Sequence, residues 1–339
     1  MYTTTTTSIA TMNLSCREMT IINSTIGINT TDTVEEIFSK QVTCIYNGIS
    51  WTTIICACVL NTLSIAMYFT RHIKRTKFNF CLLQLAISNI VQQHGFLPYI
   101  ILDVREIKTP TWYIESIYCG LSSGLSVFFT GAFVTVYTIC FVTINWYRII
   151  KKPLVRKTNK KSIFAFHMIL WFIGMVLIIP NFLSFKVDYK HGFCIRNGVF
   201  RKYLLFYKAT LLFTGLVLPI FIMCFVYILI IFSMCQTRNK FKSSTKKKHR
   251  LKVIRHIGIL IAVFLVSWLP FGVCWTLQMT SFFSTGIKGE YEKSRLIKYS
   301  LLPCLAASIL NILFHGELRA GFLDFFTFRK PVTGMSTNK

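Results

Sequence analysis

The sequence predicts an all-α membrane protein, a seven-transmembrane helix bundle with a short amphipathic helix after the seventh span. Three observations predict it: an apolar composition, seven apolar stretches of spanning length, and an uneven distribution of positive charge. Of the 339 residues, 53% are hydrophobic and only 15% are charged, and the mean hydropathy is +0.54. A soluble globular domain carries a larger share of charged residues, so most of this chain is expected to lie in lipid.

The spans follow from length, because about 20 helical residues cross a hydrocarbon core of about 30 Å. Seven apolar stretches reach this length: 49–69, 78–101, 117–144, 163–184, 204–234, 254–282 and 296–314. The third is rich in Ser, Thr and Gly, small residues that let helix backbones approach closely in a membrane. We therefore expect the third span at the centre of the bundle.

The orientation follows from positive charge, since Lys and Arg are retained on the cytoplasmic side. The connecting segments 70–77, 148–161, 235–255 and 315–339 carry 24 of the 38 Lys and Arg residues. Ten of the 12 acidic residues fall on the other side, together with the amino terminus. The sequence therefore predicts a multi-pass plasma-membrane protein whose amino terminus is extracellular.

Three regions are expected along the chain. Residues 1–48 form a Thr-rich extracellular tail with glycosylation sequons at Asn13, Asn23 and Asn29. Residues 49–314 form the bundle. Residues 315–339 form an amphipathic helix on the inner leaflet, through Glu317 to Phe326, and a short cytoplasmic tail.

Several functions are disfavoured by composition and motifs. The net charge of +26 is spread over short segments between apolar stretches, which indicates cytoplasmic loops near anionic lipid and no nucleic-acid partner. The chain has no nucleophile–base constellation, phosphate-binding loop or metal-ligand cluster, so we expect no enzyme, cofactor or metal. A seven-helix transporter or channel would need ionisable residues along a path through the spans, and no carboxylate lies within them.

Local motifs in the spans favour a receptor. Asn61 follows Val59-Leu60 in the first span, and Asn89 ends the run Leu85-Ala86-Ile87-Ser88-Asn89 in the second. The later motifs are Trp171 with Pro180 nine residues on, Pro219 with Tyr227 eight residues on, and Phe264-Leu265-Val266-Ser267-Trp268-Leu269-Pro270. These motifs resemble those of the rhodopsin-like G-protein-coupled receptors. The resemblance runs through almost the whole chain and implies that an extracellular ligand signals to heterotrimeric G proteins, to arrestin, or to both.

The resemblance also implies roles for individual residues. Cys119 and Cys194 correspond to the disulfide that ties the second outer loop to the third span. A proline inside a helix removes a backbone hydrogen bond and kinks the helix, so Pro270 is the expected hinge beneath the ligand. The residues that correspond to the activation switch are Trp268, Pro270, Phe264, Pro219, Tyr227 and Asn311.

The chain departs from the family pattern at three places in its signalling machinery. Asn89 replaces the aspartate that helps to hold a sodium ion, so sodium modulation is not expected. The acid-arginine-tyrosine box at the inner end of the third span corresponds to Asn145, Trp146 and Tyr147. The Asn-Pro-x-x-Tyr motif keeps Asn311 but has Ile312 and His315 in place of its proline and tyrosine. These changes leave open an atypical receptor that binds or scavenges ligand without G-protein coupling.

The expected ligand pocket lies around Ser126, Phe128 and Trp268. An amine receptor of this family would need an acid in the upper third of the third span. The corresponding residue here is Ser126 or Phe128, so a monoamine ligand is not expected. The outer connecting segments carry twelve basic residues against six acidic ones, which favours a peptide or an acidic small molecule.

The predicted orientation can be tested through the tail. If the tail is extracellular, digestion with a peptide N-glycosidase lowers the apparent mass of the protein made in cells, because the sequons at Asn13, Asn23 and Asn29 are occupied. An undigested band of unchanged mobility would contradict the extracellular placement.

Overall fold

The computed structural model describes residues 34–70, 72–73, 76–101, 117, 119–121, 125–151, 160–188, 193–196, 201–237, 244–279, 301–314 and 316–327. The chain divides into two compact units, Met1–Thr52 and Thr53–Lys339. The second unit holds the packed helices and all the sites discussed below. The sequons at Asn13, Asn23 and Asn29 lie outside the described residues.

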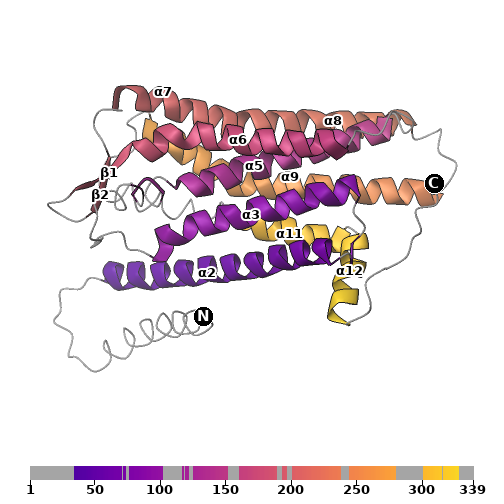
Figure 1. Ribbon diagram of the computed structural model, residues 1–339, viewed down its shortest axis with the longest axis horizontal. Helices are drawn as coiled ribbons and strands as arrows, with labels where there is room; N and C mark the ends of the chain where they lie inside the picture. The colour runs from indigo at the N-terminus through magenta and orange to yellow at the C-terminus, as the bar shows by residue number, and fades with distance from the viewer. Residues whose placement is uncertain are drawn as a thin grey trace. The chain divides into compact units, whose positions relative to one another are not determined.

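The described chain is almost entirely helical (Figure 1). The helices are α2 (Val34–Phe69), α3 (Lys77–Ile101), α5 (Ser126–Lys151), α6 (Lys160–Leu183), α7 (Arg201–Leu212), α8 (Leu218–Thr237), α9 (Ser244–Met279), α11 (Leu302–Phe314) and α12 (Gly316–Phe326). A π-helical turn, η2 (Phe213–Val217), joins α7 to α8. The helix α2 begins at Val34, well before the expected start of the first span at residue 49.

Two short strands depart from the predicted all-α fold. The strands β1 (Phe185–Asp188) and β2 (Phe193–Arg196) pair antiparallel, with Phe185 opposite Arg196 and Asp188 opposite Phe193. They lie in the predicted outer segment after the fourth span, where a chain outside lipid can form a hairpin. Cys194 lies in β2, opposite Val187.

Four helical segments of the described chain are long and apolar enough to cross a membrane: Gly48–Phe69, Cys119–Arg148, Lys161–Leu183 and Phe206–Gln236. Shorter apolar segments lie at Ile257–Pro270 and Leu302–Leu313. The helix α3 is also long enough, but polar residues such as Gln92 and Gln93 lower its hydropathy. Both side chains are only 1% exposed, so α3 turns its polar groups toward its neighbours.

The third predicted span is the most enclosed of these segments. The protein buries 61% of its apolar window, against 28% for each of the other three long segments. Its helix, α5, contacts α3, α6, α8 and η2. Its central place, expected from its small residues, is therefore confirmed.

Glycine permits the closest of these contacts. At Gly131 of α5, an added Cβ would lie 2.5 Å from the backbone nitrogen of Gln92 in α3, and an added Cβ at Gly95 of α3 would overlap the backbone nitrogen of Phe128. Backbone atoms of a helix cannot rotate away as a side chain can. The α3–α5 crossing therefore depends on glycine at both positions.

We predict that Gly131→Ala destabilises the fold by about 1–3 kcal/mol, the usual cost of forcing extra atoms into a packed interior. The change is measured as a lower melting temperature of the purified protein. Gly215→Ala is the matched control, since nothing lies within 4 Å of its added Cβ. Equal melting temperatures for the two variants would show that the crossing is not tight.

Candidate functional site

An aromatic stack crosses the bundle at Trp268. The indole is only 7% exposed and lies between Phe128 of α5 and Phe264, one turn earlier on α9. Its ring centroid is 6.1 Å from that of Phe128 and 5.9 Å from that of Phe264, with interplanar angles of 22° in both pairs. Phe128 in turn contacts Phe96 of α3 at 5.6 Å. The stack therefore links α9 to α5 and α3 through ring contacts.

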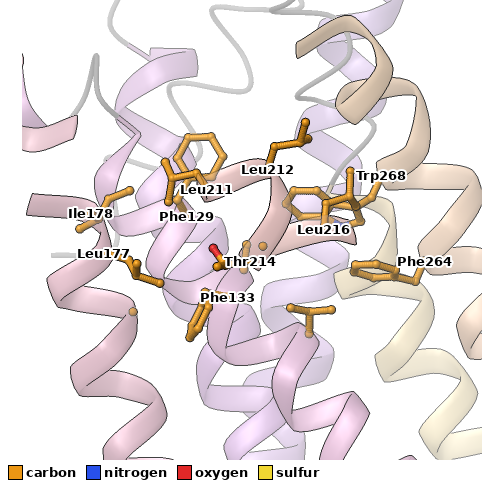
Figure 2. Close-up of a pocket in the computed structure, with 14 residues that line it drawn as sticks. Phe129, Phe133, Leu177, Ile178, Leu211, Leu212, Thr214, Leu216, Phe264 and Trp268 are labelled. Atoms are coloured by element: carbon orange, nitrogen blue, oxygen red, sulfur yellow. The ribbon is translucent and has the colours of Figure 1, made fainter. Parts of the chain in front are cut away.

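An apolar cavity adjoins this stack (Figure 2). Figure 2 shows the rings of Phe129, Phe133, Phe264 and Trp268 around it, with Leu177 and Ile178 contributed by α6. The centres of water molecules could occupy about 60 Å³ of the cavity. None of the described residues that line it is charged. Such a site suits an aliphatic or aromatic group and offers no partner to an ion.

Among the described residues that line the cavity, Thr214 alone carries a hydroxyl, and this hydroxyl bonds within its own helix. Thr214 Oγ1 donates to the carbonyl oxygen of Thr210 at 2.7 Å. A ligand group that enters the cavity therefore gains contact area and few hydrogen bonds. Specificity here depends on shape more than on polar recognition.

A proline and a π-helical turn shape the helix on one side of the cavity. In η2 the N–H of Leu218 donates to the carbonyl of Phe213, five residues earlier. The next nitrogen in this pattern belongs to Pro219 and carries no hydrogen, so the carbonyl of Thr214 is left without its helical donor. The hydroxyl of Tyr137 in α5 donates to this carbonyl at 2.9 Å. About one helical turn further along α5, Cys140 Sγ lies 3.7 Å from the carbonyl oxygen of Pro219.

A buried polar network connects α2, α3, α5 and α11. Asn89, 1% exposed, donates through Nδ2 to Asn61 Oδ1 at 3.3 Å, and Ser308 Oγ donates to the same oxygen at 2.9 Å. Thr135 Oγ1 lies 2.8 Å from Ser88 Oγ and 3.2 Å from Asn89 Oδ1. All these groups are neutral, so the network lacks the charge that would compensate a dehydrated cation in the bilayer.

Comparison with known proteins identifies the family. The family model "7 transmembrane receptor (rhodopsin family)" matches residues 60–313. The chain belongs to this receptor family. It is 23% identical over 298 residues to neuropeptide FF receptor 2 of Rattus norvegicus, covering 79% of this chain and 69% of the relative. It is 22% identical over 282 residues to somatostatin receptor type 5 of Rattus norvegicus, covering 80% and 74%.

A third relative is C-C chemokine receptor type 3 of Cavia porcellus, 24% identical over 245 residues that cover 70% of this chain and 64% of the relative. The rhodopsin-like resemblance is thus confirmed. Like the other members of this family, the protein is a multi-pass membrane receptor, and it is not an enzyme.

Asn145, Trp146 and Tyr147, the residues predicted to correspond to the acid-arginine-tyrosine box, lie near the end of α5 and make two kinds of contact. Asn145 Nδ2 donates to the carbonyl of Phe141 at 2.9 Å, and Lys151 Nζ donates to the Tyr147 hydroxyl at 2.9 Å. Both residues therefore bond within α5. Trp146 instead contacts Phe78 of α3 edge-on, with ring centroids 5.5 Å apart and an interplanar angle of 70°.

A second, smaller cavity lies beside Trp146. Ile257 and Leu260 of α9 line it, together with Asn311 of α11, which is 7% exposed. Trp146 thus lies where α3, α5, α9 and α11 meet. At the position predicted to correspond to the family's arginine, the structure thus has a ring packed against Phe78.

The remaining predicted switch residues lie on α8, α9 and α11. Tyr227 of α8 is half-buried, and its hydroxyl lies against Gly258 of α9, where an added Cβ would be 2.5 Å away. Pro270 is inside α9, as expected. Ile312 of α11 packs against the buried cluster of Met67, Ile73 and Leu318. His315 lies outside the described residues.

The predicted pocket and disulfide residues are placed as follows. Ser126 is buried, with its hydroxyl donating to the carbonyl of Gly120 at 2.9 Å, and Phe128 lies behind Trp268. Of the three predicted pocket residues, Trp268 lines the apolar cavity. Cys119 is fully buried and disulfide-bonded. The side chain of Cys194 is outside the described part, so the pairing of these two cysteines stays a prediction.

We predict that Tyr137→Phe destabilises the receptor. Removing the hydroxyl leaves the Thr214 carbonyl without a donor in an apolar interior, which costs about 1–3 kcal/mol. The melting temperature of the purified receptor measures the loss. Tyr203→Phe is the control, because Tyr203 is 74% exposed. A Tyr137→Phe receptor as stable as this control would mean that the carbonyl finds another donor.

Proposed function

We propose that this receptor has seven spans, lies in the plasma membrane with its amino terminus outside, and transmits binding of an extracellular ligand to heterotrimeric G proteins. The observation that supports the proposal most directly is the double role of Trp268. It lines the apolar cavity and belongs to the stack with Phe128 and Phe264. A ligand group in the cavity therefore touches the same side chain that couples three helices.

The proposed movement begins at this indole. A ligand group that displaces Trp268 also displaces Phe264 on the same helix, and α9 bends at Pro270, whose ring removes a backbone hydrogen bond. The helix α8 has its own irregular point at η2 and Pro219. Tyr227 of α8 and Gly258 of α9 are in close contact. In the proposed movement the two helices separate, this contact breaks, and the bundle opens on the cytoplasmic side.

We propose a peptide as the ligand class. Two of the similar proteins are named as a neuropeptide FF receptor and a somatostatin receptor. The apolar cavity would take an aromatic or aliphatic side chain at the deepest point of the peptide. The basic residues of the outer segments would attract its acidic groups, and an acidic small molecule shares that part of the argument.

The two ends of the bundle fit the same proposal. Outside, a Cys119–Cys194 disulfide would tie the β1–β2 hairpin to the helical residues before α5, and the amino-terminal tail would be glycosylated at Asn13, Asn23 and Asn29. Inside, α12 would lie on the inner leaflet. Its Leu318 is 3% exposed, whereas Leu323 and Phe326 are 59% and 55% exposed and are available to lipid.

One residue bears directly on G-protein coupling, because Trp146 lacks the guanidinium of the family pattern. The second candidate, a receptor that takes up ligand without G-protein coupling, is favoured by this substitution alone. The Trp146–Phe78 contact and the cavity beside it show that the indole is packed inside the bundle. We propose that arrestin is a partner in either case.

A cell assay separates the two candidates. G-protein dissociation and arrestin recruitment are measured by resonance energy transfer at increasing receptor density, first without ligand and then with neuropeptide FF or somatostatin. We expect the wild type to dissociate G proteins in proportion to its density. Trp146→Arg, which restores the guanidinium, should increase the signal severalfold at equal surface expression, whereas Trp146→Gln, which only removes the ring, should not.

The outcomes are distinct. Arrestin recruitment without G-protein dissociation in the wild type, together with G-protein dissociation in Trp146→Arg, would establish the atypical receptor. Silence of all three variants at normal surface density, with every probe, would reject signalling through either partner.

A further inference from the structure

The apolar cavity beside Trp268 is enclosed at one end and accessible at the other. Figure 2 shows Leu177 at one end of the cavity and Phe264 and Trp268 at the opposite end. Phe264 and Trp268 are buried. Leu177 of α6, Phe133 of α5 and Gly215 of η2 are only partly buried. The cavity is therefore closed toward α9 and accessible from the side of α6.

The accessible end lies between two segments that can cross a membrane. Lys161–Leu183 forms most of α6, and Phe206–Gln236 includes η2 and most of α8. Both α6 and η2 pack against α5, whereas the described residues show no packing of comparable extent between α6 and η2 or α8. Ile173 of α6 and Phe213 of η2, which adjoin cavity residues in the sequence, are exposed. Exposed apolar side chains of a spanning segment contact lipid, so the cavity adjoins the bilayer between α6 and η2.

A hydrogen bond bounds the space between these two segments. The hydroxyl of Tyr207 in α7 donates to the carbonyl oxygen of Leu177 in α6 at 2.9 Å. Gly215, about two turns further along the same segment as Tyr207, lines the cavity without a side chain. Nothing lies within 4 Å of an added Cβ at Gly215. Space therefore remains in the wall of the cavity beyond the Tyr207–Leu177 bond.

The chemistry of the lining indicates what fills this space. A buried water needs about two to four polar partners, and the hydroxyl of Thr214 is already bonded to Thr210. An empty apolar cavity is also unfavourable, because the atoms that line it lose dispersion contacts. Hydrocarbon from the adjoining bilayer removes this loss and requires no hydrogen bond.

We propose that the cavity binds the acyl chain of a membrane phospholipid, which enters from the bilayer between α6 and η2. A chain of methylene groups is narrow and flexible, so it can pass beside the Tyr207–Leu177 bond and reach Trp268. The space open to the centres of water molecules, about 60 Å³, suits the end of such a chain better than the rigid fused rings of a sterol.

The chain would have a direct effect on ligand binding. It would occupy the volume assigned above to a group of the extracellular ligand, so the chain and the ligand would exclude each other. This competition rests on the proposed function, whereas the binding of the chain rests on the cavity and on the receptor's place in a membrane.

The test uses the full-length receptor without added ligand, in nanodiscs of phosphatidylcholine with a diazirine in the terminal third of one acyl chain. After irradiation, the crosslinked residues are identified by mass spectrometry. We expect labelling of the buried Trp268 in addition to that of Phe172, which is 65% exposed. Met223 of α8 is fully buried and does not line the cavity, so it gives the background.

Two variants place the same ring on different sides of η2. Gly215→Phe directs the ring into open space at the cavity, and should lower labelling of Trp268 about tenfold relative to that of Phe172. Val217→Phe is the matched control and should label as the wild type, because Val217 is 47% exposed and does not line the cavity.

Three results would overturn the proposal. The first is labelling of Trp268 no stronger than that of Met223 in the wild type, a result that does not depend on how the variants fold. The second is unchanged labelling of Trp268 in Gly215→Phe. The third is labelling of Trp268 by a photoreactive sterol and not by the phospholipid. None of these measurements needs a ligand, a G protein or arrestin, so their failure is distinct from a failure of the proposed function.

Discussion

The structure depends on one constraint: in hydrocarbon, a backbone or side-chain polar group must find its partner inside the protein. At Pro219 the helix lacks a backbone N–H donor. The hydroxyl of Tyr137 on the neighbouring helix α5 supplies the missing hydrogen bond. The irregular turn η2 is therefore tied to α5, whose span is the most enclosed of the four long apolar segments of the described chain. An isolated kink becomes a contact between two spans, and the shape of the cavity beside it follows.

The same constraint organises the side of the bundle that contains α3. A helix with this many amides and hydroxyls would be poorly accommodated facing lipid. Asn89, Gln92 and Gln93 instead turn toward α2, α5 and α11, where their partners include Asn61, Thr135 and Cys304. The absence of side chains at Gly95 and Gly131 brings the α3 and α5 backbones close enough for these short polar groups to meet.

Sequence reasoning succeeds where a property is local and fails where it depends on which helices meet. Span length, apolar character and the Phe264–Pro270 motif are local, so the extent of most helices and the orientation of Trp268 toward Phe264 could be expected. Tyr137 gave no such signal, because a phenol in an apolar stretch acquires its role only from the carbonyl that Pro219 leaves free. The β1–β2 hairpin was missed because its strands are four residues each, too short for a period to emerge.

The departures from the family pattern share a physical direction. Asn89 and Trp146 are neutral residues at positions predicted to be ionised in the family pattern. Among the described residues, Asn89 makes hydrogen bonds and Trp146 makes ring contacts. Ion pairs in a low-dielectric interior respond strongly to protonation and to the loss of either partner, whereas ring packing responds mainly to shape. If signalling changes the packing among α3, α5 and α9, the receptor has at least two states. The free-energy difference between them is then set by how well Trp146, Phe78, Ile257 and Leu260 pack in each state. Such a balance would be tuned by side-chain volume more than by charge.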